Sequence, residues 1–186
     1  MATSTTSKTG TTTTWQIDPV HSEVGFSVRH LMISTVKGRF ADVKGTLEYN
    51  EADPTQSTVE VTIATRSVDT RADQRDNHLR SADFFDSEHF PNMTFRSTHV
   101  ERTSPTTGRL TGELTIRGVT RPVTLDVKRE GRGKDPWGGE RLGYSATTIV
   151  NREEFGLSWN QALETGGVVV GEEVKVTIEV ECVKQQ

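Results

Sequence analysis

The side chains with the clearest chemical potential lie in one polar segment of the chain. It holds imidazoles and carboxylates within a few residues of one another, namely His78, Asp83, Asp86, Glu88 and His89. Side chains of these types ligate metal ions and transfer protons. Their spacing does not match H-x-x-x-H or H-E-x-x-H, the patterns that place two histidines on one face of a helix. A metal-dependent or hydrolytic enzyme built on this segment is therefore the alternative, and not the leading, hypothesis.

A second pair of acids, Glu153 and Glu154, is adjacent in the sequence. On a strand, neighbouring side chains point to opposite faces, which is poor geometry for a paired-carboxylate site. The sequence also lacks a nucleophile elbow, a P-loop and a dinucleotide-binding fingerprint. These observations favour a function other than catalysis.

The elements around the polar segment alternate apolar and polar residues, which predicts about eight strands with one buried and one wet face. The expected strands cover residues 24–30, 36–49, 59–64, 93–99, 110–117, 123–128, 142–150 and 174–182. The residues of 142–150 do not fix which of their side chains face inward. This pattern is typical of an antiparallel sheet. Parity slips within 36–49, which predicts a bulge near Ala41 and Asp42. Eight strands closed into a barrel leave room for side chains or for one slender ligand.

One stretch breaks the alternation and predicts a short helix followed by an aromatic run. Thr70 and Asp73 have the spacing of a capping box, and the helix is expected to run to about Ser81. The run that follows contains Phe84, Phe85 and Phe90, too apolar to be left in water. We expect it to turn inward and close or line a cavity, either as a mobile lid or as a fixed plug.

Composition limits the remaining possibilities. The 186 residues suit one domain, predicted as 15–186, after a disordered Ser/Thr-rich tail at 1–14. No apolar run is long enough for a membrane span or a secretory signal. The net charge of −4, with both signs interleaved, argues against nucleic acid as a partner. A single cysteine, Cys182, fits a reducing compartment, and we expect a cytoplasmic protein.

Four motifs, in order along the chain, resemble the YceI-like family of polyisoprenoid-binding, lipocalin-like proteins. They are N-H-L-R-S-A-D-F-F-D-S-E-H-F-P (77–91), L-T-I-R-G-V-T-R-P-V-T-L (114–125), V-N-R-E-E-F-G-L (150–157) and G-E-E-V-K-V-T-I-E-V-E (171–181). The resemblance covers residue 15 to about 184. It implies an all-β, eight-stranded antiparallel barrel whose lumen holds an isoprenoid or similar long amphiphile. It also implies a homodimer and a protein with no cofactor, no bound metal and no catalysis.

The residues expected to line the lumen share the inward parity of their strands. They are Phe26, Val28, Ile63, Phe95, Leu114, Ile116, Leu125, Val176 and Ile178. On parity alone the same residues could fill a dry core, as in many small barrels. His30 and His99 extend two of these faces and are candidates to meet a polar head group at a barrel mouth.

The sequence thus predicts a barrel that sequesters or carries a long-chain isoprenoid-type lipid without catalysis. The alternatives are the enzyme based on the segment from His78 to His89 and a dry-core scaffold for protein interactions.

Overall fold

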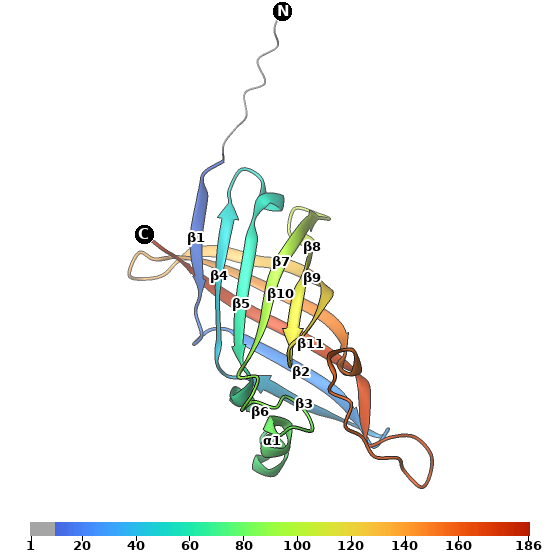
Figure 1. The fold of residues 1–186 in the computed structure, drawn as a ribbon. Coiled ribbons are helices and arrows are strands. Elements are labelled where there is room, and N and C mark those ends of the chain that lie inside the picture. Colours follow the sequence, from blue (N-terminus) through green and yellow to red (C-terminus); the bar gives the residue numbers. More distant parts are fainter. Residues whose placement is uncertain (1–9) are drawn as a thin grey trace, which may run out of the picture.

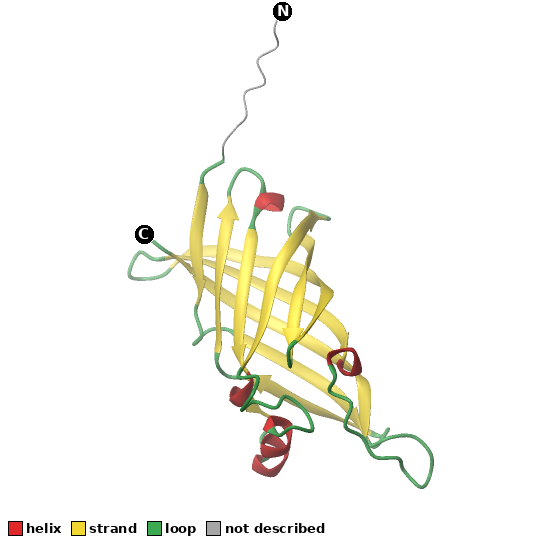
Figure 2. Ribbon diagram, in the orientation of Figure 1, coloured by secondary structure: helices red, strands yellow, loops and turns green. Residues whose placement is uncertain are grey.

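The computed structural model describes residues 10–186, which form one antiparallel sheet with a single short α-helix (Figure 1). Figure 2 shows the small helical elements gathered mostly at one end of the sheet. No described helix has both the length and the apolar character needed to cross a bilayer. The strands are β1 (Thr12–Ile17), β2 (Glu23–His30), β3 (Ser34–Phe40), β4 (Val43–Asn50), β5 (Thr58–Ala64), β6 (Val68–Asp69), β7 (Asn92–Arg102), β8 (Thr107–Ile116), β9 (Val119–Lys134), β10 (Glu140–Asn151) and β11 (Val170–Lys184). The helical elements are α1 (Asp73–Arg80), η1 (Pro54–Gln56), η2 (Thr65–Ser67) and η3 (Arg152–Phe155).

The sheet closes on itself. Strands follow the order β1-β4-β5-β7-β8-β9-β10-β11, and β11 pairs back onto β1, with Trp15 opposite Lys184 and Ile17 opposite Cys182. Closure leaves these eight strands without a free edge along the barrel. The predicted fold, an all-β antiparallel eight-stranded barrel with one short helix, is confirmed.

The remaining strands, β2, β3 and β6, continue β1, β4 and β5 beyond a corner. Long β11 pairs first with β2 and, at its end, with β1. The corner between β3 and β4 lies at Ala41 and Asp42, where the parity slip predicted a bulge. Phe40 and Val43 flank it, and both are buried, so the two skipped residues keep one apolar face turned inward.

The barrel begins earlier in the chain than the sequence pattern indicated. Thr12 to Thr14 belong to β1 and pair with Asn50 to Glu48 of β4. The Thr14 hydroxyl donates to the Glu48 carboxylate at 2.9 Å. Threonine is β-branched and fits a pleated strand, although a run of threonines carries no alternation to detect. Of the predicted 1–14 tail, residues 1–9 lie outside the described part of the chain.

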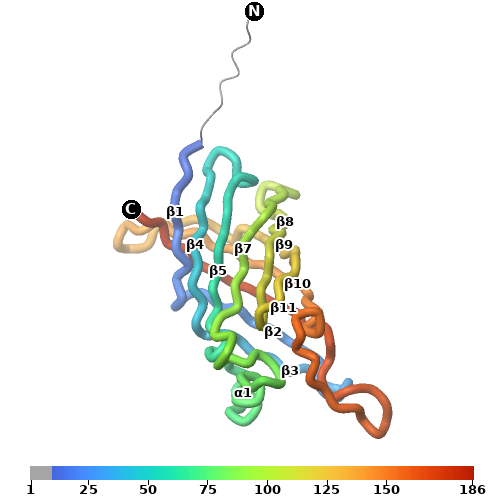
Figure 3. Tube along the Cα trace, viewed as in Figure 1, coloured from blue at the N-terminus to red at the C-terminus, as the bar shows by residue number. Residues whose placement is uncertain are grey.

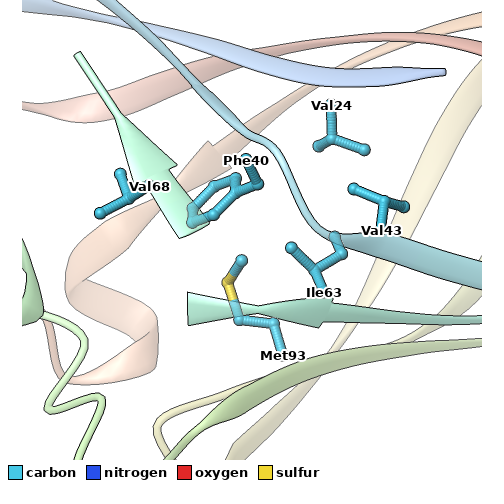
Figure 4. Close-up of a cluster of buried hydrophobic side chains, with 6 residues drawn as sticks. All are labelled: Val24, Phe40, Val43, Ile63, Val68 and Met93. Atoms are coloured by element: carbon cyan, nitrogen blue, oxygen red, sulfur yellow. The ribbon is translucent and has the colours of Figure 1, made fainter. Parts of the chain in front are cut away.

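Three apolar clusters occupy the interior. The first, drawn in Figure 4, joins the corner region to β5 and β7 and comprises Val24, Phe40, Val43, Ile63, Val68 and Met93. The second packs Trp15, Ile17, Tyr49, Leu142 and Cys182 where β1 and β11 close the barrel. The third joins the aromatic run to the start of the β10–β11 connection, through Phe84, Val150, Phe155 and Leu157.

Helix α1 forms where the sequence predicted a helix, but its start differs. The N-cap is Ala72, with no side-chain cap, so the predicted capping box is wrong. Thr70 instead donates its backbone N–H (2.9 Å) and its hydroxyl (2.6 Å) to Asp76, which is buried. Arg75 holds the same turn, donating to the Thr70 hydroxyl and carbonyl. Two hydrogen bonds to a buried carboxylate stabilise the fold more than one exposed N-cap hydrogen bond. This difference explains why Thr70 binds Asp76 and does not cap the helix.

Candidate ligand-binding site

The structure places every residue of the predicted lumen set on the inner face of its strand. Ile63 and Leu125 are buried, and the others are half-buried. Phe26, Ile116, Val176 and Ile178 pack against the first cluster, whereas Leu114 packs against the third. The strands therefore bring these apolar side chains together inside one barrel, as alternation requires.

Two apolar residues of the inner wall are not fully buried. Phe95 of β7 is paired with Val61 on one side and Leu114 on the other, yet it remains half-buried and belongs to none of the three clusters. Ile178, at the centre of β11, is also half-buried. Mid-strand apolar residues on an inner wall are fully buried when the interior is filled. Their residual exposure favours an interior that these side chains do not fill completely.

The aromatic run closes one end of the barrel. Phe85 meets Phe40 edge-on with ring centroids 5.5 Å apart, and Phe84 is buried in the third cluster. Phe90 packs against Gly118 at the β8–β9 turn. Two side chains donate hydrogen bonds to the backbone of this run. The Arg117 guanidinium donates to the Phe84 carbonyl, and the Thr65 hydroxyl donates to the Phe90 carbonyl. The run therefore closes this end of the barrel, and we call it the aromatic cap (residues 81–91).

A side chain that the sequence reasoning did not single out completes the cap. Trp159, from the β10–β11 connection, lies 5.5 Å from Phe84 and 4.7 Å from His78, centroid to centroid. Figure 3 shows this connection extending past the strand ends beside α1. Nothing in the sequence pairs Trp159 with a helix eighty residues earlier, because an isolated aromatic in an irregular segment has no periodicity.

The same connection is held by Arg152, which is buried and has no carboxylate partner among the described residues. Its guanidinium donates to the carbonyls of Gly171, Leu157, Trp159 and Val170. Burial lowers the pKa of Arg152 from its ordinary value. This arginine replaces secondary structure by satisfying the backbone of an irregular loop directly.

The histidines and aspartates of the segment from His78 to His89, on which the enzyme hypothesis rests, form two separate His–Asp pairs. His78 Nε2 contacts Asp83 Oδ2 at 2.8 Å, and His89 Nδ1 contacts Asp86 Oδ1 at 2.8 Å. The hydrogen bond that His89 donates to the Asp86 carboxylate raises the pKa of His89. In residues 10–186 these side chains do not converge into a group of three potential ligands. Glu153 and Glu154 lie exposed on η3 and not on a strand.

The two histidines proposed for a barrel mouth have different positions. His30 ends β2 on the inner parity and is half-buried beside the β2–β3 turn. His99 is exposed on the outer wall, so its predicted inward face is wrong. A bulge between Ser97 and His99 inserts one residue, which turns Val100 inward opposite Leu110 and leaves His99 opposite Thr111.

The end of the barrel opposite the cap is rich in charge. Arg141 pairs with Asp18 at 2.9 Å, with Asp135 at 3.0 Å and with Glu181. Among the described residues, one group of three possible metal ligands lies close together: Asp18, His21 and Glu181. Arg141 already neutralises the two carboxylates of this group. Arg132 bridges Glu51 and Glu140, and its guanidinium lies 5.4 Å over the Trp15 ring.

A hollow of about 420 Å³ lies across β8, β9 and β10, but its side chains belong mainly to the outer wall, such as Arg109, Asp126 and Thr147. A smaller one, of about 190 Å³, lies where β9 and β10 separate near Thr124 and Thr148. At that point the Thr148 hydroxyl donates to the Thr124 carbonyl and replaces a ladder bond. Neither hollow coincides with the predicted lumen set.

Comparison with known proteins agrees with this architecture. The chain is 40% identical over 164 residues to a UPF0312 protein of Staphylococcus epidermidis, covering 88% of this chain and 93% of the relative. The crystal structure of a Campylobacter jejuni YceI protein superposes with a TM-score of 0.73 at 33% identity, covering 85% of this chain and 90% of the other. A polyisoprenoid binding domain from Saccharophagus degradans shares the fold alone, with a TM-score of 0.65 at 15% identity, covering 92% and 98% of the two chains.

The family model of the YceI-like domain matches residues 15–182, a span that contains all but the two ends of the barrel, together with the aromatic cap and the loop held by Arg152. This protein belongs to the YceI-like domain family.

Proposed function

We propose that this protein binds a long-chain amphiphilic lipid of the isoprenoid type inside the barrel, and that it sequesters or carries that lipid without catalysis. The observation that carries the proposal is the partial exposure of Phe95 and Ile178 in the middle of the inner wall. An apolar wall with space beside it is the environment that a hydrocarbon chain prefers over water.

The energetics favour a chain-like ligand. Burial of each methylene contributes about 0.8 kcal/mol, so roughly sixteen buried carbons would contribute about 13 kcal/mol. Association costs about 4–15 kcal/mol, so a tail of this size can give measurable affinity by itself. The width of an eight-stranded barrel admits an extended chain and excludes a bulky folded molecule.

The comparisons support the same ligand class. The Saccharophagus degradans domain that shares this fold is described as a polyisoprenoid binding domain. The enzyme hypothesis gains no comparable support, because the imidazoles and carboxylates of the 78–89 segment form two isolated pairs. The half-buried residues of the inner wall favour a lipid-binding interior over a dry-core scaffold.

Native mass spectrometry before and after organic extraction tests the proposal. The protein is purified without added lipid and is then incubated with geranylgeraniol. We expect a non-covalent mass excess that extraction removes, and binding of the added alcohol to the extracted protein. Absence of both would contradict the proposal, and bound zinc in place of lipid would favour the enzyme.

A further inference from the structure

Several cationic side chains share the inner parity at the barrel end opposite the aromatic cap, and Arg129 is one of them. Arg129 of β9 lies directly across from Tyr144 of β10, and directly paired residues of an antiparallel ladder project on the same side of the sheet. Tyr144 packs against the interior cluster around Trp15 and Leu142. Arg129 therefore projects on the inner side of the wall. Its backbone N–H donates to the Thr106 carbonyl at 2.8 Å, which fixes this position to the β7–β8 turn.

Arg129 differs from Arg132, Lys184 and Arg141 because no carboxylate among the described residues neutralises its charge. Arg102 makes no ion pair there either, but its guanidinium donates to the Ser104 carbonyl at 3.1 Å. Arg132 and Lys184 share Glu51 and Glu140, and Arg141 has three carboxylates. Within residues 10–186, Arg129 makes no ion pair and no side-chain hydrogen bond, and it is exposed. The neighbouring acid, Glu130, is turned to the other side, where it receives the Ser145 hydroxyl and Lys128.

The tyrosines beside it add hydrogen-bond donors. The hydroxyls of Tyr144 and Tyr49 have no hydrogen-bond partner among the described residues, although both rings pack in the same cluster. Burial, reinforced by the proximity of Tyr49, raises the pKa of Tyr144 to about 12. The phenol therefore keeps its proton at neutral pH and can donate it to a ligand. Glu51 is near Tyr144 but is neutralised by Arg132.

An apolar path leads from these donors into the barrel. Two residues further along β10, Ala146 is buried between Val127 of β9 and Ile178 of β11. A chain lying on this path would end with its terminal group beside Arg129 and Tyr144. The guanidinium offers only donors and a positive charge, and the phenol adds one further donor. Together they match a group that accepts hydrogen bonds and carries negative charge.

We propose that Arg129 and Tyr144 form the head-group site of the barrel and select lipids that end in a carboxylate or a phosphate. This inference rests on the proposed function, because it assumes that the tail occupies the interior. It adds that the lipid enters the site with its charged end at the mouth opposite the aromatic cap.

The test compares three ligands with one tail: geranylgeranic acid, geranylgeranyl phosphate and geranylgeraniol. Calorimetry measures their dissociation constants for the wild type and for Arg129→Gln, Tyr144→Phe and Arg109→Gln. The last variant is the control, because Arg109 lies on the outer wall opposite Asp126. A charge-assisted hydrogen bond predicts that the wild type binds at least one acid about tenfold or more tightly than the alcohol.

Arg129→Gln should remove that preference and leave alcohol binding within about twofold, Tyr144→Phe should reduce it, and Arg109→Gln should retain it. The acid that binds more tightly identifies carboxylate or phosphate as the natural chemistry. Equal binding of all three ligands by the wild type, or an unchanged preference in Arg129→Gln, would overturn the head-group site alone. Failure of the wild type to bind any of the three would overturn the proposed function, and this inference with it.

Discussion

The ring of Phe95 lies against the backbone of Gly112 on the neighbouring strand, where no side chain can fit. A Cβ on Gly112 would lie 2.4 Å from Phe95 Cζ and 2.5 Å from the carbonyl oxygen of Arg96. The absence of a side chain on Gly112 therefore makes room for the aromatic ring of Phe95 on the inner wall.

Gly112→Ala should therefore destabilise the barrel. The added methyl must displace both a ring and a backbone carbonyl, and overpacking of this kind costs about 1–3 kcal/mol. Gly131→Ala is the matched control, because Gly131 also lies on a strand but has nothing within 4 Å of the new Cβ. Urea unfolding gives both free energies, and equal losses would show that the Phe95 contact is not as described.

Ile178→Phe tests whether the interior is open. In a filled core the larger ring would cost about 1–3 kcal/mol, whereas an open interior should accept it for less than about 1 kcal/mol. The same change should reduce uptake of geranylgeraniol, because it narrows the path. Thr177→Phe adds the same ring on the exposed outer face and should leave uptake unchanged. A large loss of stability in Ile178→Phe alone would favour the dry core.

Arg152→Met should release the β10–β11 connection. The change leaves the carbonyls of Gly171, Leu157 and Trp159 without their donor, and unsatisfied buried groups cost about 1–3 kcal/mol each. We expect unfolding to become easier by more than about 2 kcal/mol and the amide of Leu31, which donates to Val169 in this loop, to exchange faster. Arg66→Met, at an exposed arginine, should change neither property.

Acid should weaken the barrel through Asp18. The hydrogen bond with His21, followed by that from Arg141, lowers the pKa of Asp18 from 3.8 to about 2. The folded state therefore binds fewer protons than the unfolded chain in this range. The contribution of Asp18 is present above about pH 4 and is lost as the pH falls toward about 2.

Asp18→Asn should reduce the slope of stability against pH in that window. Part of the slope should remain, because hydrogen bonds from Lys184 and Arg132 also lower the pKa of Glu140 to about 2. Thermal unfolding at a series of pH values measures the slope, and Asp126→Asn on the outer wall is the control. An unchanged slope in Asp18→Asn would show that the contact with His21 and Arg141 does not persist in solution.

The barrel could be predicted because its strands alternate, and the exceptions have physical reasons. The corner at Ala41 and Asp42 was visible because apolar residues on both sides reveal the change of parity. The bulge at Ser97 to His99 was not, since its residues are all polar and look alike on either face. The register of β10 was equally obscure, because its inner positions include Ala146 and Thr148, which are small or polar.

The components of the candidate site differ in the same way. The inner-wall residues follow from local periodicity, whereas Arg152 and Trp159 act through contacts with segments distant in the sequence or irregular in structure. An arginine that is buried among carbonyls looks like any surface arginine in the sequence. The start of α1 was mispredicted for a similar reason. The Thr70 hydroxyl donates to the buried carboxylate of Asp76 and does not accept from the free amides of the helix.

The tryptophans occupy three different environments, and this has a spectroscopic consequence. Trp15 is fully buried beneath Arg132 and Lys184, Trp137 is 87% exposed on the β9–β10 loop, and Trp159 lies in the cap against His78. Indole emission shifts with polarity and is quenched by a protonated imidazole. The protein thus carries its own optical reporters, in which the emission of Trp159 would register a loosening of one end while that of Trp15 registers the other.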